Sequence, residues 1–237
     1  MNILCIGNSF SEDASRYVHQ IARADGVKLN IFNLYIGGCS LEKHFRNMMS
    51  DAKDYELSAN GFNTNFKVTL KEGLLNRSWD VVSLQQFSGQ SVNYETFQPY
   101  LSELSAYVKK CVPKAKQIVH QTWAYEEGCE RLHNLGYEKR ADMFEELEVA
   151  YNKAAKDIGA EMIIPSGELF QRLISEGITE LHRDTFHASL GLGRYALGLL
   201  WYKKLTSKSV INNTFADFDE EISPEIVAKI KECVEKM

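Results

Sequence analysis

Short apolar runs alternate along this chain with segments of helical periodicity. Five apolar runs predict strands, at residues 2–6, 29–36, 79–86, 117–123 and 161–164. Between and after them, apolar residues recur at spacings of three and four, which predicts helices at 14–24, 41–49, 96–112, 137–158, 167–174 and 190–205. This alternation predicts an α/β fold, a three-layer sandwich with about five parallel strands in a doubly wound, flavodoxin-like sheet and helices on both faces.

Two segments and the tail interrupt the alternation. Residues 55–70 contain Asn60-Gly61 between weakly alternating positions, which predicts a small hairpin or an irregular excursion. Residues 124–136 are polar and predict a loop. In the tail, the acidic run 217–221 predicts a solvated linker, and Ser223-Pro224 predicts the start of a last helix. We therefore expect a main domain over residues 1–206, with a linker and helix at 207–237 packed on the same domain.

Charge and hydropathy narrow the range of partners. The 237 residues include 27 basic and 32 acidic side chains, a net charge of −5, and no basic stripe is present, so we expect no nucleic-acid partner. The apolar runs are well short of the roughly 20 residues that cross a membrane, so we expect no membrane span. The sequence fits a cytoplasmic protein if the chain is full length, and an exported one if a signal peptide was removed. The oligomeric state does not follow from the sequence.

The cysteines indicate neither a disulfide framework nor a zinc site. There are five, an odd number, and no two are spaced as Cys-x-x-Cys. Cys129 and His133 are four residues apart and could share a helix face, but two ligands without a third are weak support for a metal. We expect no metal and no cofactor.

The loop after the first predicted strand is the first candidate site. The strand ends at Gly7, and the chain passes through Asn8 and Ser9 toward a helix. Ligands of open α/β sheets bind at the carboxyl ends of the strands, so Ser9 occupies a position suited to a nucleophile or to a phosphate-binding loop. Ser9 and Glu12 also fit a capping box, so from this stretch alone a purely structural role is equally open.

A second candidate lies near the end of the chain, where Asp184 and His187 form an Asp-x-x-His pattern before the last apolar helix. Residues three apart in a turn lie on one side, so the carboxylate can accept from one imidazole nitrogen and leave the other free to take a proton. His182 has no carboxylate at that offset. Ser9 with this pair is the set of groups that acyl transfer needs; alternatively, Asp184 caps a turn and His187 is an ordinary surface residue.

The order and spacing of these blocks resemble the SGNH (GDSL-like) hydrolase superfamily. More narrowly, they resemble a bacterial branch of that superfamily common in Bacteroides-type organisms, and the resemblance runs from Asn2 to about Trp201. The blocks that carry it are Gly7 to Ser11, Tyr35 to Leu41 with Gly38, Leu84-Gln85-Gln86, Thr122-Trp123-Ala124 and Asp184-x-x-His187. The resemblance implies Ser9 as the nucleophile and His187 as the general base and then acid, oriented by Asp184.

The resemblance also implies an oxyanion hole, which stabilises the negative charge of the transition state. Its donors would be the backbone N–H groups of Ser9 and Gly38 and a side-chain amide from the third block. This chain departs from the superfamily in having Asn8 where Asp is usual, and in lacking Gly-x-Asn-Asp in the third block. Gln85 or Gln86 would supply the amide there. Strand alternation lets only one of them face the site, and the Gln-x-x-Ser register favours Gln85.

We therefore expect a serine esterase or acylhydrolase that cleaves a small acyl ester, such as acetyl on a carbohydrate. Phe87 and Trp123, together with Tyr94 and Tyr125, lie near strand ends, where they could offer flat faces to a sugar or simply belong to the core. The competing hypothesis is a non-catalytic module. In that case the loop at Ser9 would hold a phosphate or a flavin, as in flavodoxin-like proteins, or the protein would bind glycans without cleaving them.

Overall fold

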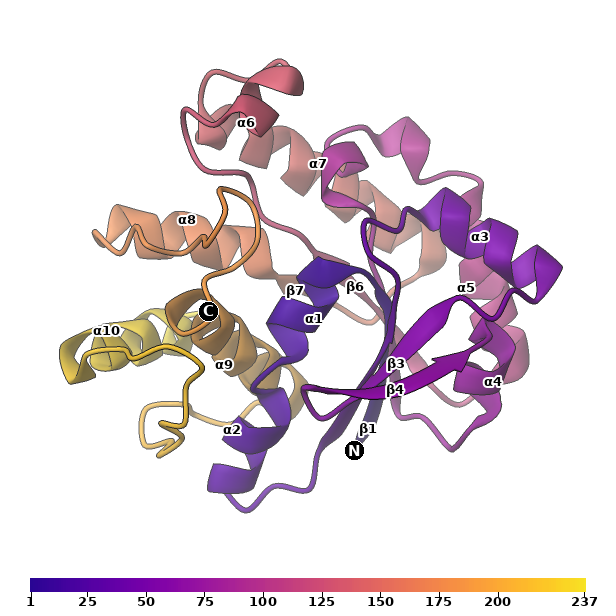
Figure 1. Ribbon diagram of the computed structural model, residues 1–237, viewed down its shortest axis with the longest axis horizontal. Coiled ribbons are helices and arrows are strands. Elements are labelled where there is room, and N and C mark those ends of the chain that lie inside the picture. The colour runs from indigo at the N-terminus through magenta and orange to yellow at the C-terminus, as the bar shows by residue number, and fades with distance from the viewer.

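A mixed sheet of seven strands runs through the middle of the computed structural model, which describes residues 1–237 (Figure 1). The strands are β1 (Asn2–Gly7), β2 (Asn30–Tyr35), β3 (Tyr55–Ala59), β4 (Phe62–Val68), β5 (Val81–Leu84), β6 (Lys116–Gln121) and β7 (Ile163–Pro165). Their spatial order is β4-β3-β2-β1-β5-β6-β7, and the section from β2 to β7 is parallel. This parallel section corresponds to the five strands that the apolar runs predict.

Helices cover both faces of the sheet. They are α1 (Ser9–Ser15), α2 (Val18–Ala24), α3 (Leu41–Ser50), α4 (Leu70–Leu75), α5 (Tyr100–Cys111), α6 (Glu130–Asn134), α7 (Arg140–Ile158), α8 (Ser166–Ser175), α9 (Leu192–Thr206) and α10 (Pro224–Glu235), with short 3-10 turns η1 (Ser88–Gln90) and η2 (Tyr94–Thr96). Side chains of α1, α2, α8, α9 and α10 share one hydrophobic cluster, and those of α3, α4, α5 and α7 share another.

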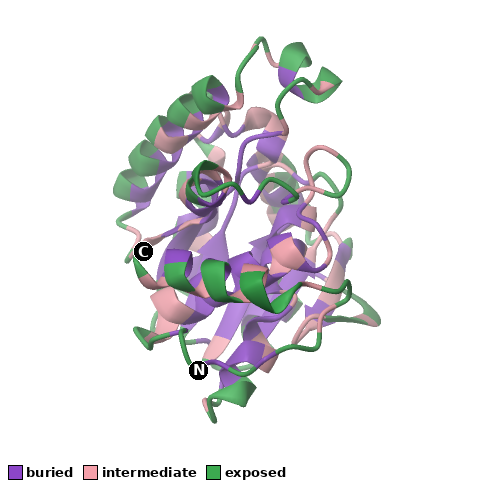
Figure 2. Cartoon of the chain, turned by 90° about the vertical axis from the view of Figure 1, so that its left-hand side faces the viewer, coloured by how far each residue is buried: buried purple, intermediate pink, exposed green.

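The central strand divides its side chains between these two cores. Ile3 and Cys5 of β1 belong to the first cluster, whereas Leu4 and Ile6 belong to the second, as the alternation of a strand requires. The central strands β1, β2, β5 and β6 are mostly buried, while the outer sides of the surrounding helices are exposed (Figure 2). The three-layer α/β architecture expected from the sequence is confirmed. None of the helices combines the length and the apolar character needed to cross a membrane.

The expectation of about five strands is wrong, because the segment after α3 adds two more. β3 pairs antiparallel with β2, and β4 pairs antiparallel with β3, so the hairpin widens the sheet at one edge. Asn60 and Gly61 form its turn with φ values of 53° and 87°, as a tight hairpin turn requires. No residue of β4 is fully buried, so its hydrophobic pattern is too weak to predict a strand of the main sheet.

Two helix predictions differ from the structure near the site. The first helix begins at Ser9, not at residue 14, and is interrupted before α2 begins at Val18. The segment expected to be a polar loop contains the short helix α6, and α7 begins at Arg140 rather than at residue 137. The early start of α1 matters, because it places Ser9 in the first helical turn directly after β1.

The tail is held against the domain by apolar and polar contacts. Ile230, Cys233 and Val234 of α10 belong to the hydrophobic cluster that includes α8 and α9. The acidic run before α10 is not simply a solvated linker, because the Asp219 carboxylate forms salt bridges with Arg16 (2.5 Å) and Arg194 (2.9 Å). The tail therefore reaches α1 and α9, both of which border the site described next.

Candidate active site

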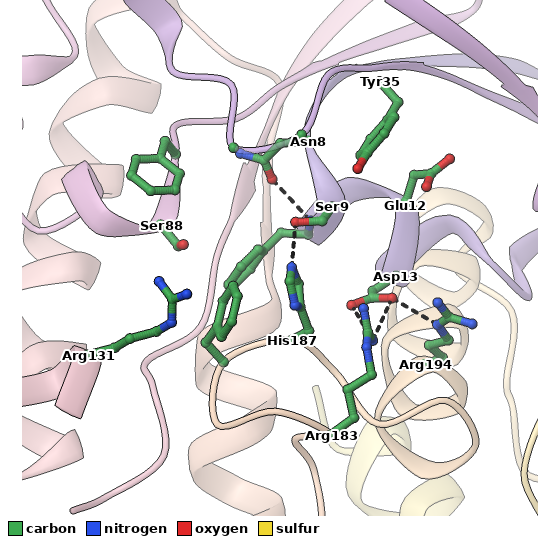
Figure 3. A pocket seen from close by; sticks show the side chains of 15 residues that line it. Asn8, Ser9, Glu12, Asp13, Tyr35, Ser88, Arg131, Arg183, His187 and Arg194 are labelled. Carbon is green, nitrogen blue, oxygen red and sulfur yellow. Dashed lines mark hydrogen bonds and ion pairs between the residues drawn. The ribbon is translucent and has the colours of Figure 1, made fainter. Parts of the chain in front are cut away.

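Ser9, His187 and Asp184 meet at the carboxyl end of β1, although Ser9 and His187 are 178 residues apart in the chain. Figure 3 shows the His187 ring pointing toward Ser9. The Ser9 Oγ lies 2.7 Å from Nε2 of His187. The other ring nitrogen of His187, Nδ1, lies 2.7 Å from Oδ2 of Asp184. The arrangement matches that of a nucleophile, a general base and a carboxylate that orients the base.

A tight turn holds the histidine beside the carboxylate. Oδ1 of Asp184 accepts a second hydrogen bond, from the backbone N–H of His187 at 2.8 Å, and Thr185 between them has a left-handed φ of 71°. Burial by itself would raise the pKa of Asp184, but the hydrogen bonds from the His187 ring and backbone outweigh it and lower that pKa. An ionised Asp184 accepts from Nδ1–H, which leaves Nε2 of the neutral ring able to accept the Ser9 proton.

Asn8, not Ser9, caps the first helix. Its Oδ1 accepts from the backbone N–H of Phe10 at 3.0 Å and from Nε2 of Gln85 at 2.8 Å, and its Nδ2 donates to the Cys39 carbonyl at 3.1 Å. One side chain thus ties together the segments that follow β1, β2 and β5. The capping-box interpretation of Ser9 is wrong, and the Ser9 hydroxyl is left to interact with His187.

Two backbone N–H groups beside Ser9 are unpaired. Ser9 is the first residue of α1, so its N–H has no partner within the helix, and the N–H of Gly38 makes no hydrogen bond within the protein. Gly38 lines the same pocket as Ser9 and has a left-handed φ of 59°, which favours glycine. Free N–H groups near a nucleophile are the donors that an oxyanion hole uses.

The pocket around Ser9 is small and polar. Its volume is about 400 Å³, which suits a small molecule or one end of a larger one. Of its 15 lining residues only 4 are hydrophobic, and the rest include both carboxylates and guanidinium groups. In the residues 1–237 that the structure describes, no three His, Cys, Asp or Glu side chains gather as metal ligands would.

The family model described as a domain of unknown function, DUF4886, matches residues 2–231. The chain belongs to this family. A DUF4886 family protein from Bacteroides uniformis, known from a crystal structure, is 31% identical, with a TM-score of 0.92 over 100% of this chain and 93% of that one.

More distant solved structures share the fold. A protein from Slackia heliotrinireducens proposed to be an SGNH hydrolase is 24% identical, with a TM-score of 0.64 over 86% of this chain and 98% of that one. The acetylxylan esterase Axe2 from Geobacillus stearothermophilus is 16% identical, with a TM-score of 0.51 over 87% of this chain and 92% of that one. No curated protein matches. These likenesses confirm the SGNH-type fold that the sequence blocks indicate.

In this DUF4886 protein Gln86 is a structural residue, contrary to its expected place in the oxyanion hole. Its Oε1 accepts from the backbone N–H groups of Leu41 (2.9 Å) and Phe87 (2.8 Å). Its Nε2 donates to the Thr96 carbonyl at 2.9 Å. The side chain is fully buried and does not line the pocket, so it joins the start of α3 to the end of β5.

Gln85 is also absent from the pocket wall. Only 2% of it is exposed, and its Nε2 donates to Oδ1 of Asn8, so it acts on the site through Asn8. A Cβ atom at Gly7 would lie 2.9 Å from Oε1 of Gln85, which shows how closely the two strand ends approach. The prediction that Gln85 is a direct oxyanion donor does not fit this geometry. From the third block, Ser88 rather than Gln85 lines the pocket. In the sequence, Ser88 served only to align the Gln-x-x-Ser pattern.

Replacing Gln86 by alanine is therefore expected to affect stability more than rate. The buried N–H groups of Leu41 and Phe87 would lose their acceptor, and the free energy of unfolding in urea should fall by about 2 kcal/mol. The kcat of Gln86→Ala and of Gln85→Ala should stay within about tenfold of the wild type. A loss of about 100-fold in kcat with unchanged stability would instead identify that glutamine as an oxyanion donor.

The two aromatic residues expected to bind substrate have different environments. Trp123 is fully buried, stacks on Phe10 with ring centroids 4.2 Å apart, and donates from Nε1 to the Phe186 carbonyl at 2.8 Å. It belongs to the core below the site, so its expected contact with substrate is wrong. Phe87 does line the pocket. Tyr125 is buried, with its hydroxyl 3.0 Å from Oγ of Ser88.

A buried ionic cluster beside the triad was not predicted from the sequence. The Asp13 side chain is 1% exposed and accepts from Arg183 Nη1 at 2.9 and 3.0 Å, and from Arg194 Nε at 2.8 Å. It also accepts from the backbone N–H of Ala188, the residue after His187, at 3.1 Å. Asp13 thus anchors the loop that carries the histidine to α1. The one feature of the sequence that could have indicated this cluster is that Arg183 directly precedes Asp184.

Proposed function

We propose that this protein is a serine esterase or acylhydrolase in which Ser9 is the nucleophile. The observation that carries the proposal is the unbroken chain of hydrogen bonds from Ser9 through His187 to Asp184. Its surroundings support it, because free backbone N–H groups lie beside Ser9 and a pocket opens over it. The flavin or phosphate alternative would leave the contact between His187 and Ser9 without a role.

The proposed reaction passes through an acyl-enzyme. His187 Nε2 takes the proton of Ser9 while Oγ attacks the ester carbonyl, and the oxygen that becomes negative is bound by the N–H groups of Ser9 and Gly38. The protonated His187 then gives its proton to the departing alkoxide. A water molecule, deprotonated by the same nitrogen, attacks the acyl group and releases the acid, which restores Ser9.

The proposed substrates are small acyl esters, with acetyl on a carbohydrate as the leading case. The volume of about 400 Å³ accommodates a short acyl chain, and the largely polar lining suits a hydroxylated alcohol. Axe2, which shares the fold, is described as an acetylxylan esterase. No metal or cofactor is required by the steps above.

Covalent labelling tests the proposal. A fluorophosphonate should add one label per chain, located at Ser9 by peptide mass spectrometry, and the Ser9→Ala variant should take up none. Burial lowers the pKa of His44 and His120 to about 3 and that of His182 to about 4, so these three rings stay neutral above pH 5, and a change in labelling rate above that pH does not come from them. Absence of label, or label on another residue, would refute the proposal.

A further inference from the structure

Arg131 stands out among the charged residues of the pocket. Three arginines line it, and two of them, Arg183 and Arg194, form salt bridges with Asp13. Arg131, on the short helix α6, forms no salt bridge, and its side chain makes no hydrogen bond; its guanidinium lies over an aromatic ring. Figure 3 shows it across from the other two, with Ser9 and His187 between. The pocket therefore contains one cation without a counterion.

The position of this cation is defined by stacking. The guanidinium carbon of Arg131 lies 4.0 Å from the ring centroid of Phe186, and that ring lies 3.8 Å from the ring of His187. Phe186 is itself held by the hydrogen bond that its carbonyl accepts from Trp123. A guanidinium stacks well on an aromatic face and keeps its N–H groups free at the edge. Arg131 is thus separated from the catalytic histidine by a single ring.

Other features of this side of the pocket also suit an anion. Ser88 lines the pocket, and Figure 3 shows its hydroxyl on the same side as Arg131. Oγ of Ser88 lies 3.0 Å from the Tyr125 hydroxyl. Over the whole pocket, three guanidinium groups face two carboxylates, those of Glu12 and Asp13, although the complete chain carries a net charge of −5. Asp13 and Asp219 already pair with Arg183 and Arg194, so Arg131 is the positive charge left free to attract a negatively charged ligand.

We propose that Arg131 binds a carboxylate of the substrate, so that the preferred substrates are esters that carry a negative charge. This inference rests on the proposed esterase function. Arginine forms paired, charge-assisted hydrogen bonds with carboxylates, and a neutral substrate would leave the guanidinium without this partner. The carboxylate belongs either to the acyl part, as in a monoester of a dicarboxylic acid, or to the alcohol part, as in an acylated uronic acid.

Two matched pairs of esters distinguish these sources. The first is 4-nitrophenyl hydrogen succinate against its methyl ester. The second is the acetylated methyl glycoside of galacturonic acid, with its carboxylate free, against the acetylated methyl glycoside of galactose. The wild type should prefer the carboxylate member of one pair by about tenfold or more in kcat/KM, as a charged hydrogen bond provides. The pair that shows the preference identifies the part of the substrate that Arg131 contacts.

Variants of the exposed charges test whether Arg131 is the cause. Arg131→Gln should abolish most of the preference, and Arg131→Lys should keep part of it, because the charge remains but the paired geometry does not. Lys139→Gln is the matched control, since Lys139 is an exposed cation near α6 that does not line the pocket. The Lys139→Gln variant should prefer the carboxylate ester as strongly as the wild type does.

Three results would overturn the inference and leave the proposed function standing. The first is a wild type that hydrolyses the members of both pairs with equal kcat/KM. The second is a preference that survives in Arg131→Gln. The third is an Arg131→Gln variant that loses activity on both members equally and melts at a lower temperature. Failure of the proposed function is distinguishable, because then no ester is hydrolysed and Ser9 is not labelled, and the inference fails with it.

Discussion

The Ser9→Ala and His187→Ala variants are each expected to lower kcat for a 4-nitrophenyl ester by about 10⁴-fold or more. Ser9 Oγ and His187 Nε2 lie 2.7 Å apart, and in the proposed mechanism both are needed to form the acyl-enzyme. The double variant should therefore be little slower than either single variant. The measurement is steady-state hydrolysis, with active-site titration to exclude traces of wild-type enzyme.

Stability provides the control for Ser9. A helix cap contributes about 1 kcal/mol, but the cap of α1 is Asn8, so Ser9→Ala should change the free energy of unfolding by no more than about 0.5 kcal/mol. Asn8→Ala, in contrast, should lose about 1 kcal/mol or more. If Ser9→Ala kept most of its turnover and melted at a lower temperature, Ser9 would be a structural residue and the enzyme hypothesis would be wrong.

Replacing Asp13 by asparagine is expected to lower the free energy of unfolding by about 3 kcal/mol and kcat by about tenfold or more. Without the Asp13 carboxylate, the guanidinium groups of Arg183 and Arg194 lose their buried partner, and the NH₂ of the new amide would face their N–H donors. The side chains of Arg183 and Arg194 are 27% and 18% exposed, so water compensates part of the cost. The rate should fall because Asp13 also holds the backbone N–H of Ala188, next to His187.

Asp219→Asn is the matched control, since Asp219 also pairs with Arg194 but is more exposed and does not line the pocket. Its side chain is 27% exposed, against 1% for Asp13, so we expect a loss of about 1 kcal/mol and no change in kcat. Urea unfolding and kcat should be measured for both variants below their unfolding transitions. An Asp13→Asn variant with lower stability but full kcat would show that the cluster holds the fold without positioning the histidine.

The layer architecture and the region of the site could be predicted because both depend on local periodicity. Alternating apolar runs and helical spacings predicted the five parallel strands, and carboxyl ends of parallel strands share one edge of a sheet. That rule is enough to place Ser9 and Gly38 at the same edge. The Asp-x-x-His spacing likewise predicted the 2.7 Å contact between Asp184 and His187, since residues three apart in a turn lie on one side.

The roles of the two glutamines could not be predicted from the same rules. Strand alternation required Gln85 and Gln86 to point in different directions, but it did not show what lay in each direction. The backbone N–H of Leu41, 45 residues before Gln86, occupies the amide oxygen that a local argument left free. Buried amides hydrogen-bond to whatever the fold brings to them, so their partners depend on the packing of distant elements.

The sequence by itself therefore determined the fold class, the edge of the sheet where the site lies, and the three residues that meet there. Only the tertiary structure decided that the weakly patterned hairpin joins the sheet, that Trp123 is core, that Asp13 joins Arg183 and Arg194, and that Arg131 is left unpaired. The physical reason is range. Periodicity reports how a segment meets its immediate surroundings. The contacts that decided these points join residues far apart in the chain, 45 positions for Leu41 and Gln86 and 170 or more for Asp13 and its two arginines, and no local pattern records them.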